Sequence, residues 1–348
     1  MRYWWVLVLS SMLLACSQEP SSQVLKIQGA TMGTHYHIAW VGLDAKQAPS
    51  LQVAVDERLQ AINKSMSTYD PQSELSRLNK GELAVDAQGN IALSADLTEV
   101  LAKSLQIWQQ SAGKFDITVG PLVNLWGFGP EARIEKAPEP ELITERLAKI
   151  GSQHLKLDSA NRKLHLDSPQ YVDLSAIAKG WGVDQIALLL EKQGIQNYMV
   201  EIGGEIRTKG QKADAQPWRI AIERPDPQAL DQQAALIIAP KNMGVATSGS
   251  YRNYFENNGV RYSHTIDPAT GYPITHKLVS VTVLHPETGM ADGWATAIDV
   301  AGPEQGLRLA ETYKLPVYML VAEDGGLFKE VISSEFKKMF PQVSEGEK

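Results

Sequence analysis

The chain has 348 residues, of which 43% are hydrophobic and 21% are charged, and its formal net charge at pH 7 is −7. This composition excludes general disorder, and the length allows one large domain or two of ordinary size. A net acidic chain without basic clusters argues against nucleic acid as a partner, but it leaves open nucleotide phosphates bound through a metal ion and backbone amides.

The N-terminus predicts a secretory targeting segment. Arg2 precedes the apolar run 3–9, which is too short for a mature transmembrane helix. Leu13-Leu14-Ala15-Cys16 is similar to a bacterial lipobox, and Cys16 is the only cysteine in the chain. We expect a lipoprotein signal peptide at 1–15, a lipidated tether at 16–23 and a folded domain at 24–340. The alternative is an ordinary cleaved signal with a chance cysteine.

Lipidation of Cys16 has two consequences. Acyl chains such as palmitate would anchor the protein to a membrane, facing the periplasm, without a transmembrane helix. We expect the inner rather than the outer membrane, although Ser17 leaves that choice open. In addition, no thiol would remain for a disulfide, a thiolate metal site or a nucleophile.

Hydrophobic periodicity predicts helices and strands that interleave along the chain. The expected helices lie at about 49–66, 76–78, 95–111, 139–150, 180–193, 291–301 and 303–313. The expected strands lie at 24–38 (two, broken by a glycine-flanked bend), 154–158, 163–167, 198–202, 218–223, 234–239, 279–284 and 317–321. Residues 113–121 are expected as a loop or short strand, and 126–140 as an irregular connection. Because no regular βαβ repeat appears, we predict an α+β or mixed α/β fold.

The segment Ala291-Asp292-Gly293-Trp294-Ala295-Thr296-Ala297 is the most informative motif. Asp292 and Thr296 are four residues apart, so in a helix they lie on one face, one turn from each other. Both are hard oxygen ligands, and a site with few carboxylates leaves room for the phosphate oxygens that accompany Mg²⁺. The structural alternative is a helix that begins near Asp292, with Thr296 bonded back to a carbonyl oxygen.

Four further segments could carry chemistry. Asp173 and Lys179 flank a strand-to-helix junction, where they either bind a phosphate or form a salt bridge and helix cap. Residues 201–205 and 246–250 are small-residue loops that either cradle a phosphate or make ordinary turns. His264 precedes the turn at Asp267 and is either a proton acceptor or a hydrogen-bonded loop residue.

The positions of the other histidines do not indicate a metal site. His35, His37, His154, His165 and His285 lie in alternating strands or turns, and we interpret them as structural. No His-x-x-x-His pair and no cysteine cluster indicates zinc.

Together the ordered motifs resemble the ApbE family, the FAD:protein FMN transferases, from about Gly29 to Val321. The residues that carry the resemblance are Thr31-Met32-Gly33-Thr34, Ser67-Thr68-Tyr69-Asp70-Pro71, Phe115-Asp116-Ile117-Thr118-Val119-Gly120-Pro121, Val172-Asp173-Leu174-Ser175-Ala176-Ile177-Ala178-Lys179-Gly180, Ile202-Gly203-Gly204-Glu205, Ser263-His264-Thr265-Ile266-Asp267-Pro268 and residues 291–297. The resemblance implies an ApbE-like (T-fold-like) architecture.

The resemblance also implies roles for individual residues. An FAD site would be lined by Met32, Tyr69, Lys114, Phe115, Asp116, Asp173, Lys179 and Ile266. Mg²⁺ would be held by the Ala176 carbonyl, Asp292 and Thr296, with Ala295 adjacent. His264 would be the candidate catalytic base.

The implied reaction moves FMN from FAD onto a Thr (or Ser) hydroxyl of a partner protein, as a phosphoester, and releases AMP. The implied acceptors belong to membrane redox proteins such as ion-pumping NADH:quinone oxidoreductases. Two alternatives remain: an FAD pyrophosphatase that releases free FMN, and a non-catalytic periplasmic lipoprotein that binds flavin.

Overall fold

The computed structural model describes residues 23–42, 44–130, 136–225, 234–249, 254–257 and 260–344. The predicted signal peptide and Cys16 lie outside the described residues, as does the tether up to residue 22. Within the described segments, no helix is both long and apolar enough to cross a membrane.

An eight-stranded sheet forms the centre of the fold, and every neighbouring pair of strands in it is antiparallel. Its strands, in spatial order, are β1 (Leu25–Thr31), β2 (Thr34–Val41), β6 (Asn197–Ile202), β7 (Glu205–Lys209), β10 (Gly244–Ser248), β13 (Leu278–His285), β14 (Val317–Ala322) and β15 (Phe328–Ile332). An antiparallel sheet with helices packed on it is an α+β architecture, as predicted.

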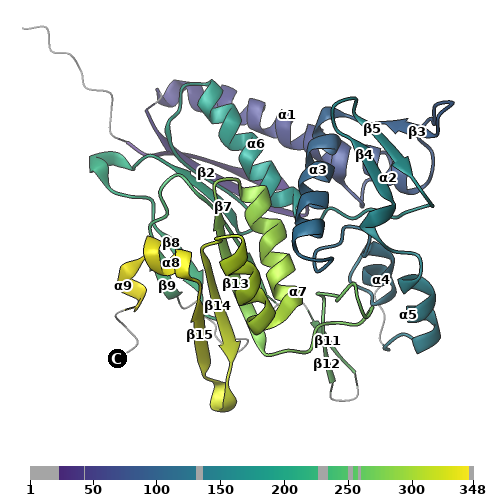
Figure 1. The fold of residues 1–348 in the computed structure, drawn as a ribbon. Coiled ribbons are helices and arrows are strands. Elements are labelled where there is room, and N and C mark those ends of the chain that lie inside the picture. The colour runs from purple at the N-terminus through teal and green to yellow at the C-terminus, as the bar shows by residue number, and fades with distance from the viewer. Residues whose placement is uncertain are drawn as a thin grey trace, which may run out of the picture.

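Three long helices cover one face of this sheet (Figure 1): α1 (Ala48–Met66), α6 (Ala178–Lys192) and α7 (Thr288–Thr312). The apolar stripe of α1, predicted from the sequence, is buried against the sheet and α6. In β14 the side chains alternate, so that Val317 and Met319 join this helical core whereas Tyr318 and Leu320 face the other side.

The opposite face of the sheet is covered by a hairpin and a short helix. The hairpin comprises β8 (Ile220–Glu223) and β9 (Ala234–Ile238), and the helix is α8 (Ser334–Met339), followed by α9 (Pro341–Ser344). Ile222 of β8 and Phe336 of α8 share a second apolar cluster with Tyr318 and Leu320 of β14.

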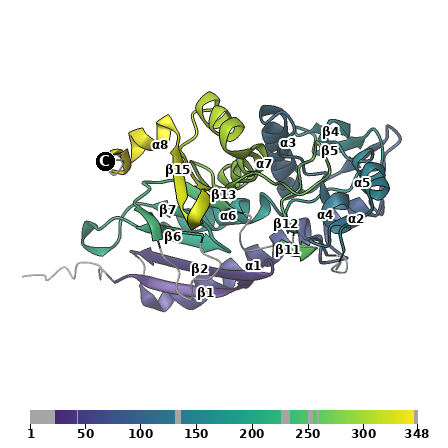
Figure 2. The same ribbon diagram turned by 90° about the horizontal axis from the view of Figure 1, so that it is seen from below.

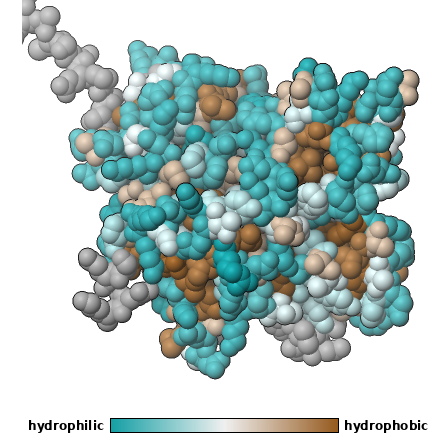
Figure 3. Space-filling model, viewed as in Figure 1, coloured by the Kyte–Doolittle hydropathy of each residue, from teal (hydrophilic) through white to brown (hydrophobic). Residues whose placement is uncertain are grey.

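A set of smaller elements lies beside the helical layer, at the side of the molecule away from α8 (Figure 2). It contains α2 (Glu74–Asn79), α3 (Ala95–Gln110), α4 (Gly120–Leu125), α5 (Pro140–Leu147), the sheet β3 (Asn90–Ala92), β5 (Lys163–Leu166) and β4 (Leu155–Asp158), and the pair β11 (Tyr254–Asn257) and β12 (Val260–Ser263). Hydrophilic residues cover most of the face shown in Figure 3, and the hydrophobic ones appear there in separate patches.

Two expectations for individual elements were wrong, and a third was confirmed. The expected loop or strand at 113–121 ends instead in the first turn of α4, which spans 120–125; Pro121 suits this turn because its missing N–H costs nothing there. Residues 244–248 are the central strand β10 rather than a loop. The two predicted helices, 291–301 and 303–313, are both present within α7, which begins at Thr288 and is interrupted by the non-helical Gly302 (φ 76°) before Pro303.

Candidate functional site

A cavity of about 470 Å³ opens between the helical layer, the end of the central sheet and the α4 region. Segments between residues 68 and 300 form its walls: 68–69, 114–130, 173–179, 203–205, 247–249, 264–268 and 292–300. A site assembled in this way exists only in the folded chain, and its volume is in the range of small-molecule sites.

The structure brings most of the predicted site residues to this cavity. Its lining includes Tyr69, Lys114, Phe115, Asp116, Asp173, Ala176, Lys179, His264, Ile266, Asp292 and Thr296. Two predicted residues do not line it. Met32 packs at the β1–β2 turn over Gly182 of α6, and the Ala295 side chain is buried in the helical core.

Asp292 lies in the second turn of α7 and is only 6% exposed. Its Oδ2 atom accepts a hydrogen bond from the Gly180 N–H, at 3.0 Å. Gly180 lies in the first turn of α6, whose own N-cap residue provides no side-chain acceptor. The carboxylate therefore caps the neighbouring helix, not its own, and lies near the positive end of the α6 dipole.

Thr296 lines the same wall one turn further along α7. Its hydroxyl makes no hydrogen bond among the residues that the structure describes, so the bond back to a carbonyl oxygen is not formed. The structural alternative, in which Asp292 begins its own helix and Thr296 bonds back to a carbonyl oxygen, is therefore not observed.

Lys179 lies between two buried carboxylates. Its Nζ is 3.3 Å from Glu205 Oε1 and 4.0 Å from Asp292 Oδ2. Burial alone would lower the pKa of Lys179, but these two carboxylates raise it overall. Burial raises the pKa of Asp292, against the attraction of Lys179. Asp173 does not pair with Lys179; its carboxylate accepts from the Ser175 backbone N–H and hydroxyl instead.

Glu205 is a site residue that sequence reasoning missed. It begins β7 directly after the Gly203-Gly204 turn, is 5% exposed, and lines the cavity. Burial raises its pKa to about 8, even though Lys179 opposes that shift. Its Oε2 atom has no hydrogen-bond partner within the described part of the chain. In the sequence, Glu205 directly follows a pair of glycines, and this pattern predicts only a phosphate-binding loop or an ordinary turn.

The helices α6 and α7 cross very closely beside Asp292. A Cβ atom at Gly180 would lie 2.4 Å from the Thr288 carbonyl oxygen, and one at Gly289 would lie 3.1 Å from Trp181 Cα. One turn along the crossing, Asp184 of α6 accepts hydrogen bonds from the backbone N–H groups of Thr288 and Gly289, both at 2.9 Å. Each helix therefore provides the carboxylate that caps the other.

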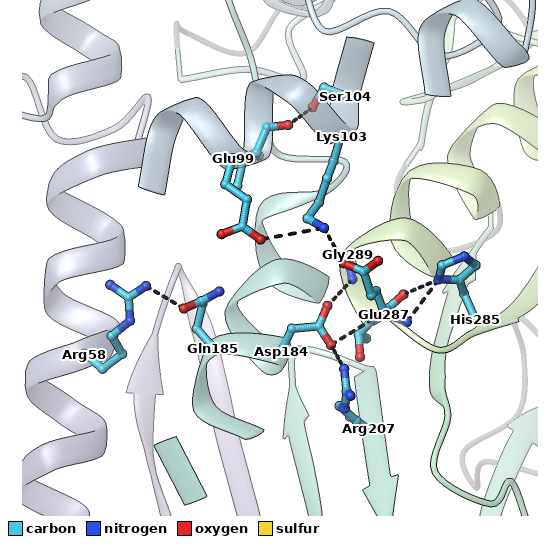
Figure 4. Close-up of polar contacts among 12 residues, drawn as sticks. Arg58, Glu99, Lys103, Ser104, Asp184, Gln185, Arg207, His285, Glu287 and Gly289 are labelled. Carbon is cyan, nitrogen blue, oxygen red and sulfur yellow. Dashed lines mark hydrogen bonds and ion pairs between the residues drawn. The ribbon is translucent and has the colours of Figure 1, made fainter. Parts of the chain in front are cut away.

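Ion pairs surround the Asp184 end of this crossing (Figure 4). Arg207 of β7 donates to Asp184 at 2.5 Å, and Lys103 of α3 pairs with Glu287, just before α7. The start of α7 is thus fixed to α6, α3 and the sheet at once.

The rim of the cavity carries an aromatic ring and an ion pair. Tyr69 is 69% exposed and stands at the edge of the cavity. Across the rim, Lys114 Nζ donates to Asp267 Oδ2 at 3.1 Å. The carboxylate of Asp116 is engaged with Thr118 and Ser152, so its role here is to shape the loop that precedes α4.

His264 lies on the loop between β12 and β13 and lines the cavity. Its ring meets the edge of the Phe128 ring, with centroids 6.3 Å apart and planes at 70°. The loop is held from outside the cavity by Trp126, whose Nε1 donates to the Gly271 carbonyl oxygen at 2.9 Å.

Comparisons with known proteins show the family of this chain. The model of the ApbE family matches residues 32–319. The chain belongs to the ApbE family. It is 48% identical over 340 residues to an FAD:protein FMN transferase of Vibrio cholerae, covering 97% of this chain and 98% of that protein. It is 46% identical to the FAD:protein FMN transferase of Haemophilus influenzae, covering 94% of each chain.

A solved structure of the flavin transferase ApbE from Vibrio cholerae has the same fold, with a TM-score of 0.81 and 46% identity. The match covers 91% of this chain and 99% of that one. The predicted family, the α+β fold and the enzyme class, a transferase, are confirmed. The cavity is therefore the candidate active site of an ApbE-family flavin transferase.

Proposed function

We propose that this chain transfers FMN from FAD to a Thr (or Ser) hydroxyl of a partner protein, forming a phosphoester and releasing AMP. One observation carries the proposal. A buried carboxylate, an unbonded hydroxyl and an ammonium (Asp292, Thr296 and Lys179) gather on one wall of a cavity of small-molecule size. This is the chemistry needed to bind and polarise a pyrophosphate.

The oxygen atoms on this wall suit Mg²⁺. The Asp292 carboxylate, the Thr296 hydroxyl and the Ala176 residue all reach the cavity lining, and the Ala176 carbonyl would complete the set. No cluster of three or more His, Cys, Asp or Glu ligands occurs among the described residues. A set with a single carboxylate agrees with a cation that takes its other ligands from phosphate oxygens and water. When bound there, Mg²⁺ would neutralise the charge that develops on the pyrophosphate oxygens.

The remaining groups would orient FAD and activate the acceptor. Lys179, held by Glu205, would bind a phosphate oxygen, and Tyr69 and Phe115 would contact the rings of the dinucleotide. The acceptor hydroxyl would lose its proton to His264 while its oxygen bonds to the FMN-side phosphorus. The bond from that phosphorus to the bridging oxygen breaks, and AMP leaves with that oxygen.

The proposal includes the place of the reaction. A lipid anchor at Cys16 would hold the enzyme at the periplasmic face of a membrane, where redox proteins such as NADH:quinone oxidoreductase subunits would present their acceptor residues. Anchoring both partners in one membrane raises the effective concentration of the enzyme near them.

One experiment tests the reaction directly. The soluble form without residues 1–16 is incubated with FAD, Mg²⁺ and a Thr-containing acceptor domain, and the acceptor is weighed by intact-mass spectrometry. We expect a gain equal to bound FMN that disappears with EDTA. Hydrolysis of FAD without a gain would instead indicate a pyrophosphatase, and intact FAD would indicate a flavin-binding protein or an unsuitable acceptor.

A further inference from the structure

Asp299 is a buried carboxylate on α7 that the proposed reaction does not use. It follows Asp292 by seven residues and Thr296 by three, so all three lie along one face of the helix. Its side chain is completely buried. A carboxylate in such a place costs free energy unless its partners compensate, which calls for a reason beyond packing.

The partners of Asp299 are two hydroxyls from the cavity wall. Asp299 Oδ2 accepts hydrogen bonds from Ser248 Oγ at 3.0 Å and from Thr265 Oγ1 at 3.2 Å. Ser248 ends β10, and Thr265 directly follows His264; both line the cavity. One carboxylate therefore connects the helix that carries Asp292 and Thr296 to the loop that carries His264.

Hydrogen bonds from the described residues satisfy only one of the two carboxylate oxygen atoms of Asp299. Its Oδ1 atom is buried and has no hydrogen-bond partner among the described residues. Burial raises the pKa of Asp299 to about 7, against the effect of the two hydroxyls. Replacing such a group by a well-packed apolar side chain is often neutral or stabilising, so stability alone does not account for it.

Two further contacts hold the loop on the α4 side of the cavity. Asp267 pairs with Lys114 at the rim, and Trp126 binds Gly271. The bond from Thr265 to Asp299 ties the residue next to His264 directly to the face of α7 that carries Asp292 and Thr296, so without it the position of the histidine relative to that face would be less constrained.

We propose that Asp299 is a positioning residue: through Thr265 it holds His264 at a set distance from Asp292 and Thr296. The inference rests on the proposed function, in which His264 takes the acceptor proton. It goes further by assigning the geometry of that step to a residue that touches neither substrate nor metal. Displacement of a catalytic group by about 1 Å is enough to lower a rate on the order of a hundredfold.

A set of variants distinguishes a positioning role of Asp299 from a role in folding. We expect Asp299→Ala to lower kcat for FMN transfer by roughly tenfold to a hundredfold. The Kd for FAD, measured by flavin fluorescence, should stay within about twofold, because no predicted FAD residue is bonded to Asp299. Asp299→Asn should recover most of the rate, since an amide oxygen can still accept from both hydroxyls.

Thr265→Val keeps the side-chain shape and leaves Asp299 in place, so it breaks the link without emptying the core. We expect it to lower kcat in the same direction as Asp299→Ala. Thr98→Val is the matched control: its hydroxyl is also buried and bonded, to the Ser94 carbonyl oxygen at 2.7 Å, but it lies in α3 away from the cavity. That control should lower the melting temperature to a similar extent and leave kcat unchanged.

A double-mutant cycle then decides whether Asp299 acts through His264. In an enzyme that already carries His264→Ala, Asp299→Ala should cost less than about a further twofold in kcat. An equal loss in both backgrounds, or a loss of FAD affinity that matches the loss of kcat, would overturn the inference. If Asp299→Ala does not fold, Thr265→Val and Asp299→Asn decide by the same criteria.

The failure of the proposed function would be seen separately. A wild-type enzyme that adds no FMN to any acceptor would remove the transferase proposal for this chain. A His264→Ala enzyme with an unchanged kcat would remove the base and, with it, this inference.

Discussion

At the scale of single residues, Asp292 has two roles that mutation can separate. It caps α6 through the Gly180 N–H, and it lines the cavity, where we propose that it is a metal ligand. The sequence indicated the second role and not the first, because a cap donated by another helix leaves no local pattern. A variant at this position therefore needs a control for lost capping.

We predict that Asp292→Ala reduces FMN transfer by at least about a hundredfold, because the proposed metal site would lose its carboxylate. The lost cap should cost only about 1 kcal/mol of the free energy of unfolding, so the protein still folds. Transfer is measured by intact mass and stability by urea unfolding. Ser94→Ala, which removes the N-cap of α3, is the control and should reproduce the stability loss alone. Full transfer by the Asp292→Ala enzyme would rule out this metal site.

The buried Asp299 leads to a second prediction at the scale of single residues, which concerns how the free energy of unfolding depends on pH. Its folded-state pKa of about 7 lies above the unfolded value of about 3.9. Between these values the folded state keeps a proton that the unfolded state releases, so the free energy of unfolding falls as pH rises through this window. Above pH 7 the loss stays constant.

The Asp299→Asn protein does not lose stability in this way. Its free energy of unfolding relative to wild type should therefore rise between about pH 4 and 7, by at most on the order of 1.4 kcal/mol per pH unit, and then level off. Urea unfolding across this range is the measurement. Asp86→Asn is a control of opposite sign, because Lys163 lowers the pKa of Asp86 and its contribution is lost only in acid. A difference that does not vary with pH would contradict the prediction.

At the scale of secondary-structure elements, the crossing of α6 and α7 depends on glycine. We predict that Gly180→Ala destabilises the protein by about 2 kcal/mol, because the new methyl would meet the Thr288 carbonyl oxygen and Asp292 Cβ. The separation of the helices should also lower transfer. The measurements are the midpoint of unfolding and the transfer rate.

Gly182→Ala is the matched control on the same helix. The atom closest to its new methyl is Met32 Cε at 2.9 Å, the far end of a flexible side chain that can move aside. If both substitutions destabilise equally, close approach of the two backbones is not what the glycine at 180 provides.

The elements also show how far the sequence predicts the fold. The helices near 49–66 and 95–111 and the hairpin at 154–167 were predicted to within two residues, because each has its own apolar period. The strands β7 and β10 were missed. Glu205–Lys209 is mostly polar, and Gly244–Ser248 consists mainly of small residues, so each becomes a strand only through its neighbours in the sheet.

The residues of the candidate site were likewise predicted only in part. Residues within compact motifs, such as Asp292 with Thr296, were predicted together. Glu205, Asp184 and Asp299 were not, because their roles arise from contacts with segments far away in the chain. Tertiary contact, rather than local spacing, defines these three carboxylates.

At the scale of the whole molecule, the cavity walls come from segments between residues 68 and 300. FAD bound there should therefore stabilise the entire fold. We predict one cooperative unfolding transition whose free energy increases by about 2.7 kcal/mol when free FAD is at 100 times its Kd. Tryptophan fluorescence and circular dichroism should report the same shift, and EDTA should reduce it. Two transitions, of which FAD moves only one, would show that the walls belong to separate folding units.

The mutual capping of α6 and α7 bears on the entropy of binding. Asp184 and Asp292 order the first turns of both helices before any substrate arrives. The loss of backbone freedom in these turns thus belongs to the free energy of folding and does not weaken the affinity for the dinucleotide. Flavin binding at this wall should be accompanied by little conformational ordering of the backbone, so that affinity there reflects contacts and desolvation.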